Sequence, residues 1–122
     1  SIYPHKEKIL INADRTQINR LLTKLIQNAI QSVPENRNAE IEIVTREEDG
    51  KVILSVKDNG TGIPEHMTNK IFTPNFTTKT SGTGLGLAMC KGIVEKLDGR
   101  IWFETKENEY TIFFVELPVI EN

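Results

Sequence analysis

The strongest constraint on the fold is one long helical pattern in the first third of the chain. Asp14 followed by Gln17 is typical of an N-cap with its capping-box partner, so the sequence predicts a helix that begins there. The apolar residues that recur along it at three- and four-residue spacing are Ile18, Leu21, Leu22, Leu25, Ile26, Ala29, Ile30 and Val33. Pro34 ends the pattern, because proline lacks the amide hydrogen that another helical turn would need. This helix has an apolar face that another element must cover.

A strand pair is predicted after the helix. Residues 40–46 and 51–57 alternate apolar and polar side chains on either side of Asp49-Gly50, which predicts an antiparallel hairpin closed by that turn. One face of this hairpin must also be covered. A glycine-marked turn then leads to a short helix predicted over residues 65–72.

The last third of the chain combines another helix with another hairpin. An amphipathic helix is predicted over residues 85–97, ended by Gly99, and residues 100–105 and 110–117 predict the second hairpin. Because the helices follow pairs of strands, we expect an α+β fold: a two-layer sandwich with a mixed, mostly antiparallel sheet and helices on one face. The length of 122 residues, of which 38% are hydrophobic, fits one domain over residues 1–122 with a real core.

Charge and apolar content exclude several classes of partner. The 15 basic and 17 acidic residues are interspersed and give a net charge of -2, so there is no basic stripe for nucleic acid and no polybasic membrane patch. No stretch approaches the roughly 20 apolar residues of a membrane span. The single cysteine, Cys90, lies between apolar residues and is expected to be a buried core thiol. It cannot form an internal disulfide, which suits a reducing cytosol, so we expect a cytoplasmic domain.

One amide stands at the border of the apolar stripe of the first helix. A rotation of about 100° per residue puts Asn28 beside the column of Leu21 and Leu25. There its oxygen could bind a magnesium ion that already carries triphosphate, since magnesium keeps its waters and takes few protein ligands. A border asparagine bonded to the backbone explains the position as well, so position alone leaves both interpretations open.

A predicted strand ends in an acidic residue and two glycines, in the sequence Asp58-Asn59-Gly60-Thr61-Gly62. The glycines allow positive φ or a close approach of the backbone to a ligand. A buried carboxylate at a strand end can accept a hydrogen bond from an exocyclic amine such as that of adenine. An ordinary hairpin turn also uses Asp and Gly, but this one leads into a new segment instead of a partner strand.

Alternate glycines run directly into the second long helix, in Gly82-Thr83-Gly84-Leu85-Gly86. Such a loop presents backbone N–H groups and the positive end of a helix, which favours a phosphate. Its spacing differs from those of the dinucleotide fingerprint and the P-loop, and the strand-first context of those motifs is missing. Close helix packing would also require glycines. The residues just upstream that offer donors and a cation to a γ-phosphate are Thr77, Thr78 and Lys79.

Four motifs occur in an order and spacing that resemble the N box, first glycine box, F box and second glycine box of GHKL ATPases. They are LLTKLIQNAIQSV, DNGTGIP, IFTPNFTTK and GTGLGLA. This superfamily includes gyrase, heat-shock chaperone, histidine kinase and mismatch-repair enzymes, and the resemblance covers nearly the whole chain. The compact TTK-x-x-GTGLGLA lid is most similar to that of nitrogen-regulation-type sensor kinases. The resemblance implies a Bergerat-type ATP-binding fold.

The resemblance also implies roles for particular residues. Asn28 matches the magnesium-binding asparagine, and Asp58 matches the aspartate that reads adenine. Gly60 and Gly62 match the glycines that admit the base, and Ile63 would line the adenine pocket. The remaining matches are the phosphate loop of Gly82, Thr83, Gly84, Leu85 and Gly86, the basic lid residue Lys79, the F-box aromatics Phe72 and Phe76, and Thr111 of the last family signature. Core packing would explain the aromatic residues almost as well.

Two positions depart from the family pattern. Lys24 stands four residues before Asn28, where the family usually has asparagine or, in hydrolytic members, a glutamate that activates water. Lys24 cannot be that base, so the resemblance points to a kinase in which an imidazole attacks the γ-phosphate. Asn75 replaces a common aromatic residue, which would loosen the lid hinge or alter a partner contact.

The implied function is that of the catalytic domain of a sensor histidine kinase that uses ATP and Mg²⁺. Neither His5 nor His66 stands in an H-box setting, so the acceptor histidine is expected on a dimerisation domain elsewhere in a longer protein. The implied partners are that domain and a response regulator, and no direct binding of nucleic acid is expected. Any membrane contact, such as an anchor in the bacterial inner membrane, would belong to the rest of the protein. The alternatives are a serine-type protein kinase or anti-sigma module and a degenerate ATP-binding interaction domain.

Overall fold

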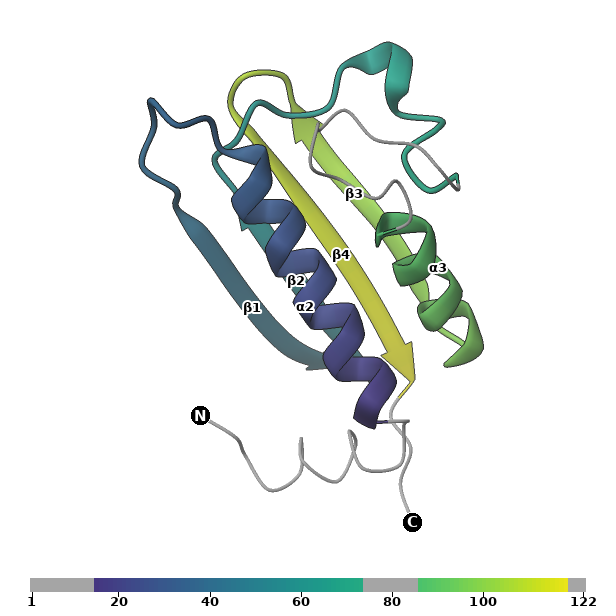
Figure 1. The fold of residues 1–122 in the computed structure, drawn as a ribbon. Helices are drawn as coiled ribbons and strands as arrows, with labels where there is room; N and C mark the ends of the chain where they lie inside the picture. Colours follow the sequence, from purple (N-terminus) through teal and green to yellow (C-terminus); the bar gives the residue numbers. More distant parts are fainter. Residues whose placement is uncertain (1–14, 74–85, 119–122) are drawn as a thin grey trace.

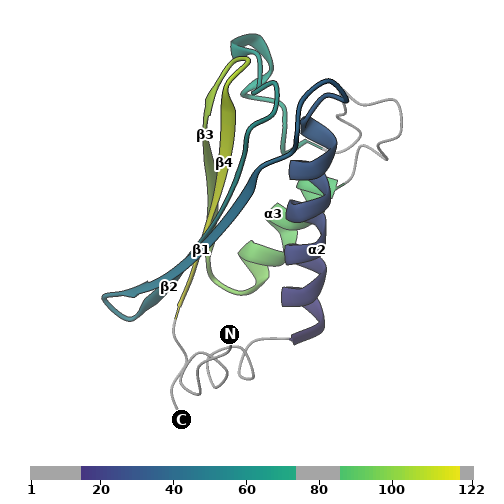
Figure 2. The ribbon, with the colours of Figure 1, turned by 90° about the vertical axis from the view of Figure 1, so that its left-hand side faces the viewer.

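The computed structural model describes residues 15–73 and 86–118, which form two layers. In chain order the elements are α2 (Arg15–Ser32), β1 (Ile41–Glu48), β2 (Lys51–Asp58), the 3₁₀ helix η1 (Glu65–Met67), α3 (Gly86–Lys96), β3 (Arg100–Lys106) and β4 (Tyr110–Pro118). The described residues contribute four strands to the sheet, and α2 and α3 both lie on one face of it, as Figure 1 and Figure 2 show. The predicted α+β class is therefore confirmed.

Every strand pair in the described part of the sheet is antiparallel. The order β1-β2-β4-β3 sets the two predicted hairpins side by side, with β2 against β4. In the first hairpin Asp49 (φ 52°) and Gly50 (φ 76°) both adopt left-handed conformations, as a two-residue type I′ turn requires. The pairing of β2 with β4 brings Asp58 opposite Thr111. Two polar residues that are far apart in the sequence thus meet at one end of the sheet.

The core lies between the sheet and the two helices. Its buried residues are Leu21, Leu25 and Ala29 of α2, Val56 of β2, Ile71 after η1, Cys90, Ile93 and Val94 of α3, and Phe113 and Val115 of β4. Full burial of a side chain such as Leu or Val contributes roughly 1.5–3 kcal/mol. The apolar face of α2 and the inward-facing residues of β4 therefore belong to one apolar core.

Helix α2 ends where the sequence predicts, at Ser32 ahead of Pro34. The Ser32 hydroxyl donates a hydrogen bond of 2.8 Å to the carbonyl oxygen of Asn28, within the last helical turn. The predicted N-cap, Asp14, lies outside the described residues. Neither helix within 15–73 and 86–118 has both the length and the apolar character needed to span a bilayer.

The short helix predicted over residues 65–72 is wrong for most of its length. Only Glu65–Met67 forms a 3₁₀ helix, and the chain continues as turns in which backbone N–H groups bond three residues back, for example Lys70 to Met67 at 2.9 Å. The hydroxyl of Thr68 donates to the carbonyl of Glu65 at 2.9 Å. Hydroxyl groups that bond nearby carbonyls in this way compete with the α-helical ladder.

Helix α3 ends in a Schellman motif with an unexpected residue in the left-handed position. The N–H of Gly99 bonds the carbonyl of Val94 at 2.9 Å, and the N–H of Asp98 bonds that of Glu95 at 3.1 Å. Asp98, with φ 60°, makes the turn that the sequence assigns to Gly99. Gly99 is needed for another reason, because a Cβ there would collide with the carbonyl oxygen of Glu116. The glycine therefore permits close packing of the helix end on β4.

Candidate functional site

A cavity of about 240 Å³ lies between the last turns of α2, the loop after β2, and β4, and we name it the α2–β4 cavity. Its apolar lining consists of Pro34, Ile63, Pro64, Ile71, Leu87 and Phe113. Its polar lining consists of Asn28, Gln31, Ser32, Thr61, Gly62 and Thr111. Apolar walls with a few convergent polar groups are typical of small-molecule sites. This lining suits a small molecule with apolar surface and a few polar groups.

The strand pair β2/β4 places two buried polar side chains beside this cavity. Asp58 and Thr111 face each other across the pair and are only 1% and 3% exposed. Asp58 Oδ1 accepts a hydrogen bond of 2.8 Å from the N–H of Gly60. Thr111 lines the cavity directly, whereas Asp58 borders another hollow at the end of β2. Burial of a carboxylate is costly unless hydrogen bonds compensate it, so this position is a constrained one.

Hydrogen bonds between two threonine hydroxyls determine whether Thr111 can accept a hydrogen bond from a ligand. Thr105 Oγ1 donates to the carbonyl of Tyr110 at 3.0 Å and accepts from the N–H of Ile63 at 2.9 Å. The two threonine oxygens are 2.9 Å apart. Because the single hydroxyl hydrogen of Thr105 goes to Tyr110, Thr111 is the donor of that pair. The Thr111 oxygen can therefore accept a hydrogen bond from a group in the cavity.

The structure gives the two glycines of the loop a packing role. A Cβ on Gly60 would collide with the carbonyl oxygen of Ser32 and lie 2.8 Å from Asp58 Oδ1. Gly62 has φ 74°, and a Cβ there would lie 2.6 Å from the carbonyl oxygen of Lys106. The sequence predicts that these glycines admit a ligand. Packing against α2 and the β3–β4 turn already requires them, and Gly62 also lines the cavity.

Further hydrogen bonds fix the same loop from both sides. The N–H of Thr61 donates to the carbonyl of Ser32 at 3.1 Å, and the N–H of Asn108 donates to the carbonyl of Thr61 at 2.6 Å. Arg37 Nη1 donates to the carbonyls of Asn59 at 2.6 Å and Gly60 at 3.1 Å. Sequence reasoning missed Arg37, since an arginine in a polar connection carries no local signal of its partner. The loop is thus held in place by the backbone and by one cation.

Asn28 and Lys24 project from α2 one turn apart. Asn28 is half-buried and lines the α2–β4 cavity. Lys24 is half-buried as well and lines a second space of about 550 Å³, which we name the α2–α3 hollow. The residues around this hollow are Thr16, Asn19, Arg20, Thr23, Lys24, Gly86 and Met89. The two spaces therefore border successive turns of one helix.

The structure brings together some of the predicted site residues and separates others. Asn28, Gly62, Ile63 and Thr111 line the same cavity. Gly86, the first residue of α3, borders the α2–α3 hollow instead. The predicted residues Lys79, Gly82, Thr83, Gly84 and Leu85, like Asn75 and Phe76, lie outside the described residues. Three further residues line the cavity although the sequence analysis assigns them no binding role: Ile71, Leu87 and Phe113.

One buried titratable group lies under the two helices. Cys90 of α3 has no exposed surface. Burial raises the pKa of its thiol to about 12, and the positive charge of Lys24 opposes that rise. The thiol therefore stays protonated at neutral pH, which agrees with the core role predicted for it.

The sequence comparisons extend over most of the chain. The family profile described as histidine kinase-, DNA gyrase B-, and HSP90-like ATPase matches residues 13–121. Sporulation kinase A of Bacillus subtilis (strain 168) is 37% identical over 113 residues, 93% of this chain and 18% of that protein. Sensor histidine kinase ZraS of Escherichia coli (strain K12) is 39% identical over 109 residues, 89% of this chain and 23% of that protein. The chain spans about a fifth of the length of these curated relatives.

A solved structure shares both the fold and much of the sequence. The catalytic domain of histidine kinase ThkA, in a nucleotide-free form, matches with a TM-score of 0.77 and 46% identity. The match covers 88% of this chain and 69% of that chain. Together with the profile match over 13–121, it establishes that this chain belongs to the family of histidine kinase-, DNA gyrase B- and HSP90-like ATPases.

Proposed function

We propose that this chain is the ATP-binding catalytic domain of a two-component sensor histidine kinase, which transfers the γ-phosphate of ATP to a histidine on a separate dimerisation domain. The α2–β4 cavity carries this proposal, because Asn28, Gly62, Ile63 and Thr111 line one small space beside the buried Asp58. The similarity to sporulation kinase A and ZraS supports the kinase class. In this proposal residues 1–122 form one domain of a longer kinase.

The α2–β4 cavity is proposed to hold the adenine ring. Ile63 and Phe113 supply apolar surface for the ring, and the Thr111 oxygen can accept a hydrogen bond. Asp58 is proposed to select adenine through its exocyclic amine, with Gly60 held in place by the same carboxylate. The fixed loop would keep these groups in position before the nucleotide arrives, which reduces the ordering cost of binding.

Magnesium and the phosphates are proposed to lie towards Asn28. The Asn28 amide lines the cavity and offers a neutral oxygen, which fits an ion that takes few protein ligands. When bound, Mg²⁺ would neutralise part of the charge on the phosphates. The proposed phosphate contacts also include Gly86 and, outside the described residues, Lys79, Gly82, Thr83, Gly84 and Leu85. Backbone N–H groups of such a glycine loop suit an anion.

The proposed reaction is transfer to an imidazole. A nitrogen of the acceptor histidine forms a bond to the γ-phosphorus while the bond to the β–γ bridging oxygen breaks, and ADP leaves. Lys24, one turn before Asn28, carries an ammonium group and cannot accept a proton from water as a carboxylate would. His66 is exposed on η1 and does not line the cavity. Both observations support an acceptor supplied by another domain.

The finer features of the proposal concern the whole protein. The phosphoryl group would pass from the acceptor histidine to an aspartate of a response regulator. We propose that the chain is of the nitrogen-regulation type because of its compact TTK-x-x-GTGLGLA lid. The domain would act in the cytoplasm, and an inner-membrane anchor would lie in other parts of the kinase.

Phosphotransfer to a separately made acceptor domain tests the proposal. The chain, radiolabelled ATP, Mg²⁺ and the dimerisation domain of the full-length kinase should give a labelled acceptor whose phosphate is lost in acid and kept in base, as phosphohistidine requires. A variant with the acceptor histidine changed to alanine serves as the control. Acid-stable label, or label that persists in the alanine variant, would refute transfer to histidine.

A further inference from the structure

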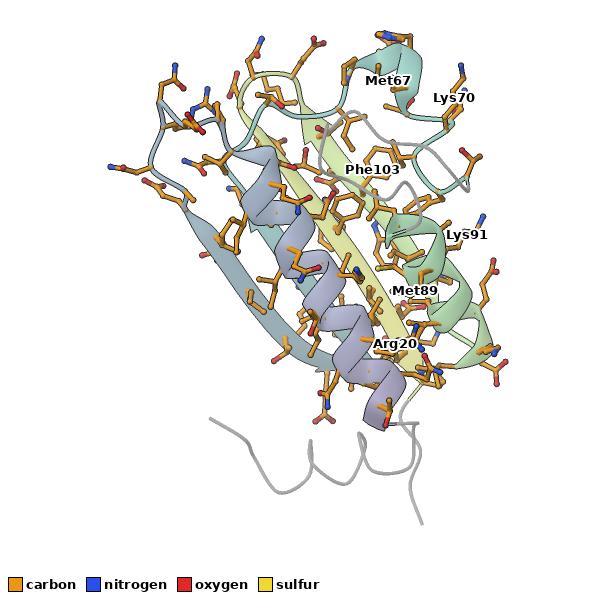
Figure 3. The ribbon with its side chains drawn as sticks, in the orientation of Figure 1. Arg20, Met67, Lys70, Met89, Lys91 and Phe103 are labelled. Atoms are coloured by element: carbon orange, nitrogen blue, oxygen red, sulfur yellow. The ribbon has the colours of Figure 1, made fainter. Side chains whose placement is uncertain are left out.

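The α2–α3 hollow has a lining suited to an anion. Among the described residues around it are two cations, Arg20 and Lys24, together with hydroxyl and amide groups, and none is acidic. Figure 3 shows Arg20 of α2 and Met89 of α3 close together between the helices, and Arg20 Nη2 is 3.2 Å from the Met89 sulfur. The Arg20 guanidinium makes this contact at the exposed side of the hollow, whereas Lys24 is half-buried.

The hollow adjoins the α2–β4 cavity along both helices. Asn28 lines the cavity and Lys24 lines the hollow, and four residues correspond to about 6 Å along a helix axis. On α3, Gly86 lines the hollow and the next residue, Leu87, lines the cavity. A molecule that fills the cavity and has a charged tail would pass Asn28 and reach Lys24.

The Lys24 side chain lies close to Gly86, the first residue of α3. A Cβ built on Gly86 would lie 4.0 Å from Lys24 Cδ. The Lys24 charge also acts on Cys90, whose pKa is raised by burial and lowered by that charge. Within residues 15–73 and 86–118, Lys24 has no carboxylate in ion-pair distance. Lys24 lines the α2–α3 hollow, so a phosphate in that space would meet its positive charge.

We propose that Lys24 binds the polyphosphate of ATP and supplies part of the positive charge that Mg²⁺ would otherwise provide. The proposal rests on the proposed function, because it takes the adenine ring to occupy the α2–β4 cavity. A resident ammonium group within one helical turn of Asn28 attracts the phosphates whether or not the ion is present. The site consequently holds ATP with reduced dependence on magnesium.

Calorimetric titration with adenosine, ADP and ATP, each in Mg²⁺ and in EDTA, tests this role. Lys24→Ala should weaken ATP binding in EDTA by about tenfold or more, as expected for loss of a charged contact. The loss should be smaller for ADP and absent for adenosine. Lys24→Arg should restore most of the affinity, and the ratio of ATP affinity with and without Mg²⁺ should rise in Lys24→Ala.

Lys91→Ala is the matched control, since Lys91 is an exposed lysine on the side of α3 away from α2 (Figure 3). It should leave all three affinities unchanged, and thermal unfolding should show that each variant folds. Unchanged ATP binding by Lys24→Ala in EDTA, or an equal loss for adenosine, would overturn the proposal while leaving nucleotide binding intact. Absence of nucleotide binding by the wild-type chain would overturn the proposed function and this role together.

Discussion

The two ends of the candidate nucleotide site are built in different ways. At the α2–β4 cavity, the loop from Asn59 to Ile63 is fixed by backbone hydrogen bonds to Ser32 and Asn108, and its glycines pack directly on neighbouring backbone. At the α2–α3 hollow, long cationic side chains of α2 face the first turn of α3, and the space is more than twice as large. One end depends on backbone packing and the other on charge.

This difference separates stability from affinity. A change in the loop must disturb backbone packing, so it should alter unfolding and the recognition of every ligand that carries the base. A change in the hollow removes a charge from a partly solvated space, so it should alter phosphate binding and leave the fold intact. The calorimetric titrations of Lys24→Ala described above test the second statement directly.

The largest expected effect is on stability, at Gly62. Gly62 and Gly50 have nearly equal φ values, 74° and 76°, but only Gly62 has backbone atoms where a Cβ would lie. Gly62→Ala should lower the free energy of unfolding by at least about 3 kcal/mol, because left-handed strain adds to a collision. Gly50→Ala should cost about 1 kcal/mol from strain alone. Equal losses in urea unfolding would show that the loop is not tightly packed.

The next effect in size is on base recognition, at Asp58. Asp58→Asn keeps an acceptor for the Gly60 N–H, so the fold should lose at most about 1 kcal/mol. Adenosine and ATP should both bind about 30-fold more weakly, close to 2 kcal/mol for a lost charged hydrogen bond. Glu40→Gln, at an exposed carboxylate beside the same strand end, is the control. A loss confined to ATP would contradict the assignment of Asp58 to the base.

The smallest expected effect concerns Cys90, the buried thiol of α3. Cys90 follows Met89 and is fully buried, and burial raises the pKa of its thiol to about 12, although Lys24 opposes the rise. Below pH 9 both states keep the proton, whereas at higher pH only the folded state keeps it, so stability falls towards pH 12. Between pH 9 and 10 the wild type should lose about 1 kcal/mol more than Cys90→Ala. Parallel losses would contradict a raised pKa of the Cys90 thiol in the folded state.

The local patterns of the sequence predict the framework well. The periodicity of α2, its end before Pro34 and both hairpins are confirmed, because each depends on side chains that are close in sequence. The helix over residues 65–72 is wrong because hydroxyl–carbonyl bonds and three-residue turns compete with it. The sequence assigns the left-handed conformation to Gly99, but Asp98 adopts it. This could not be predicted, because Gly99 is required by its contact with Glu116, which is distant in the sequence.

Only part of the candidate site could be predicted from the sequence. Asn28, Gly62, Ile63 and Thr111 line one cavity, and their roles in binding remain predictions. Leu87 could not be predicted, because an apolar residue at a helical spacing indicates burial without distinguishing a core from a cavity wall. Arg37 and the packing demand on Gly60 depend on tertiary contacts alone.

The most direct test of a site with two unlike ends is an amide NMR titration, first with adenosine and then with Mg-ATP. Adenosine should shift the resonances of the loop residues Gly60, Gly62 and Ile63 and of Thr111. Mg-ATP should shift the same resonances and also those of Lys24 and Gly86. Shifts of Lys24 and Gly86 without any change in the loop, or no response of the loop to adenosine, would contradict a nucleotide that spans the two spaces.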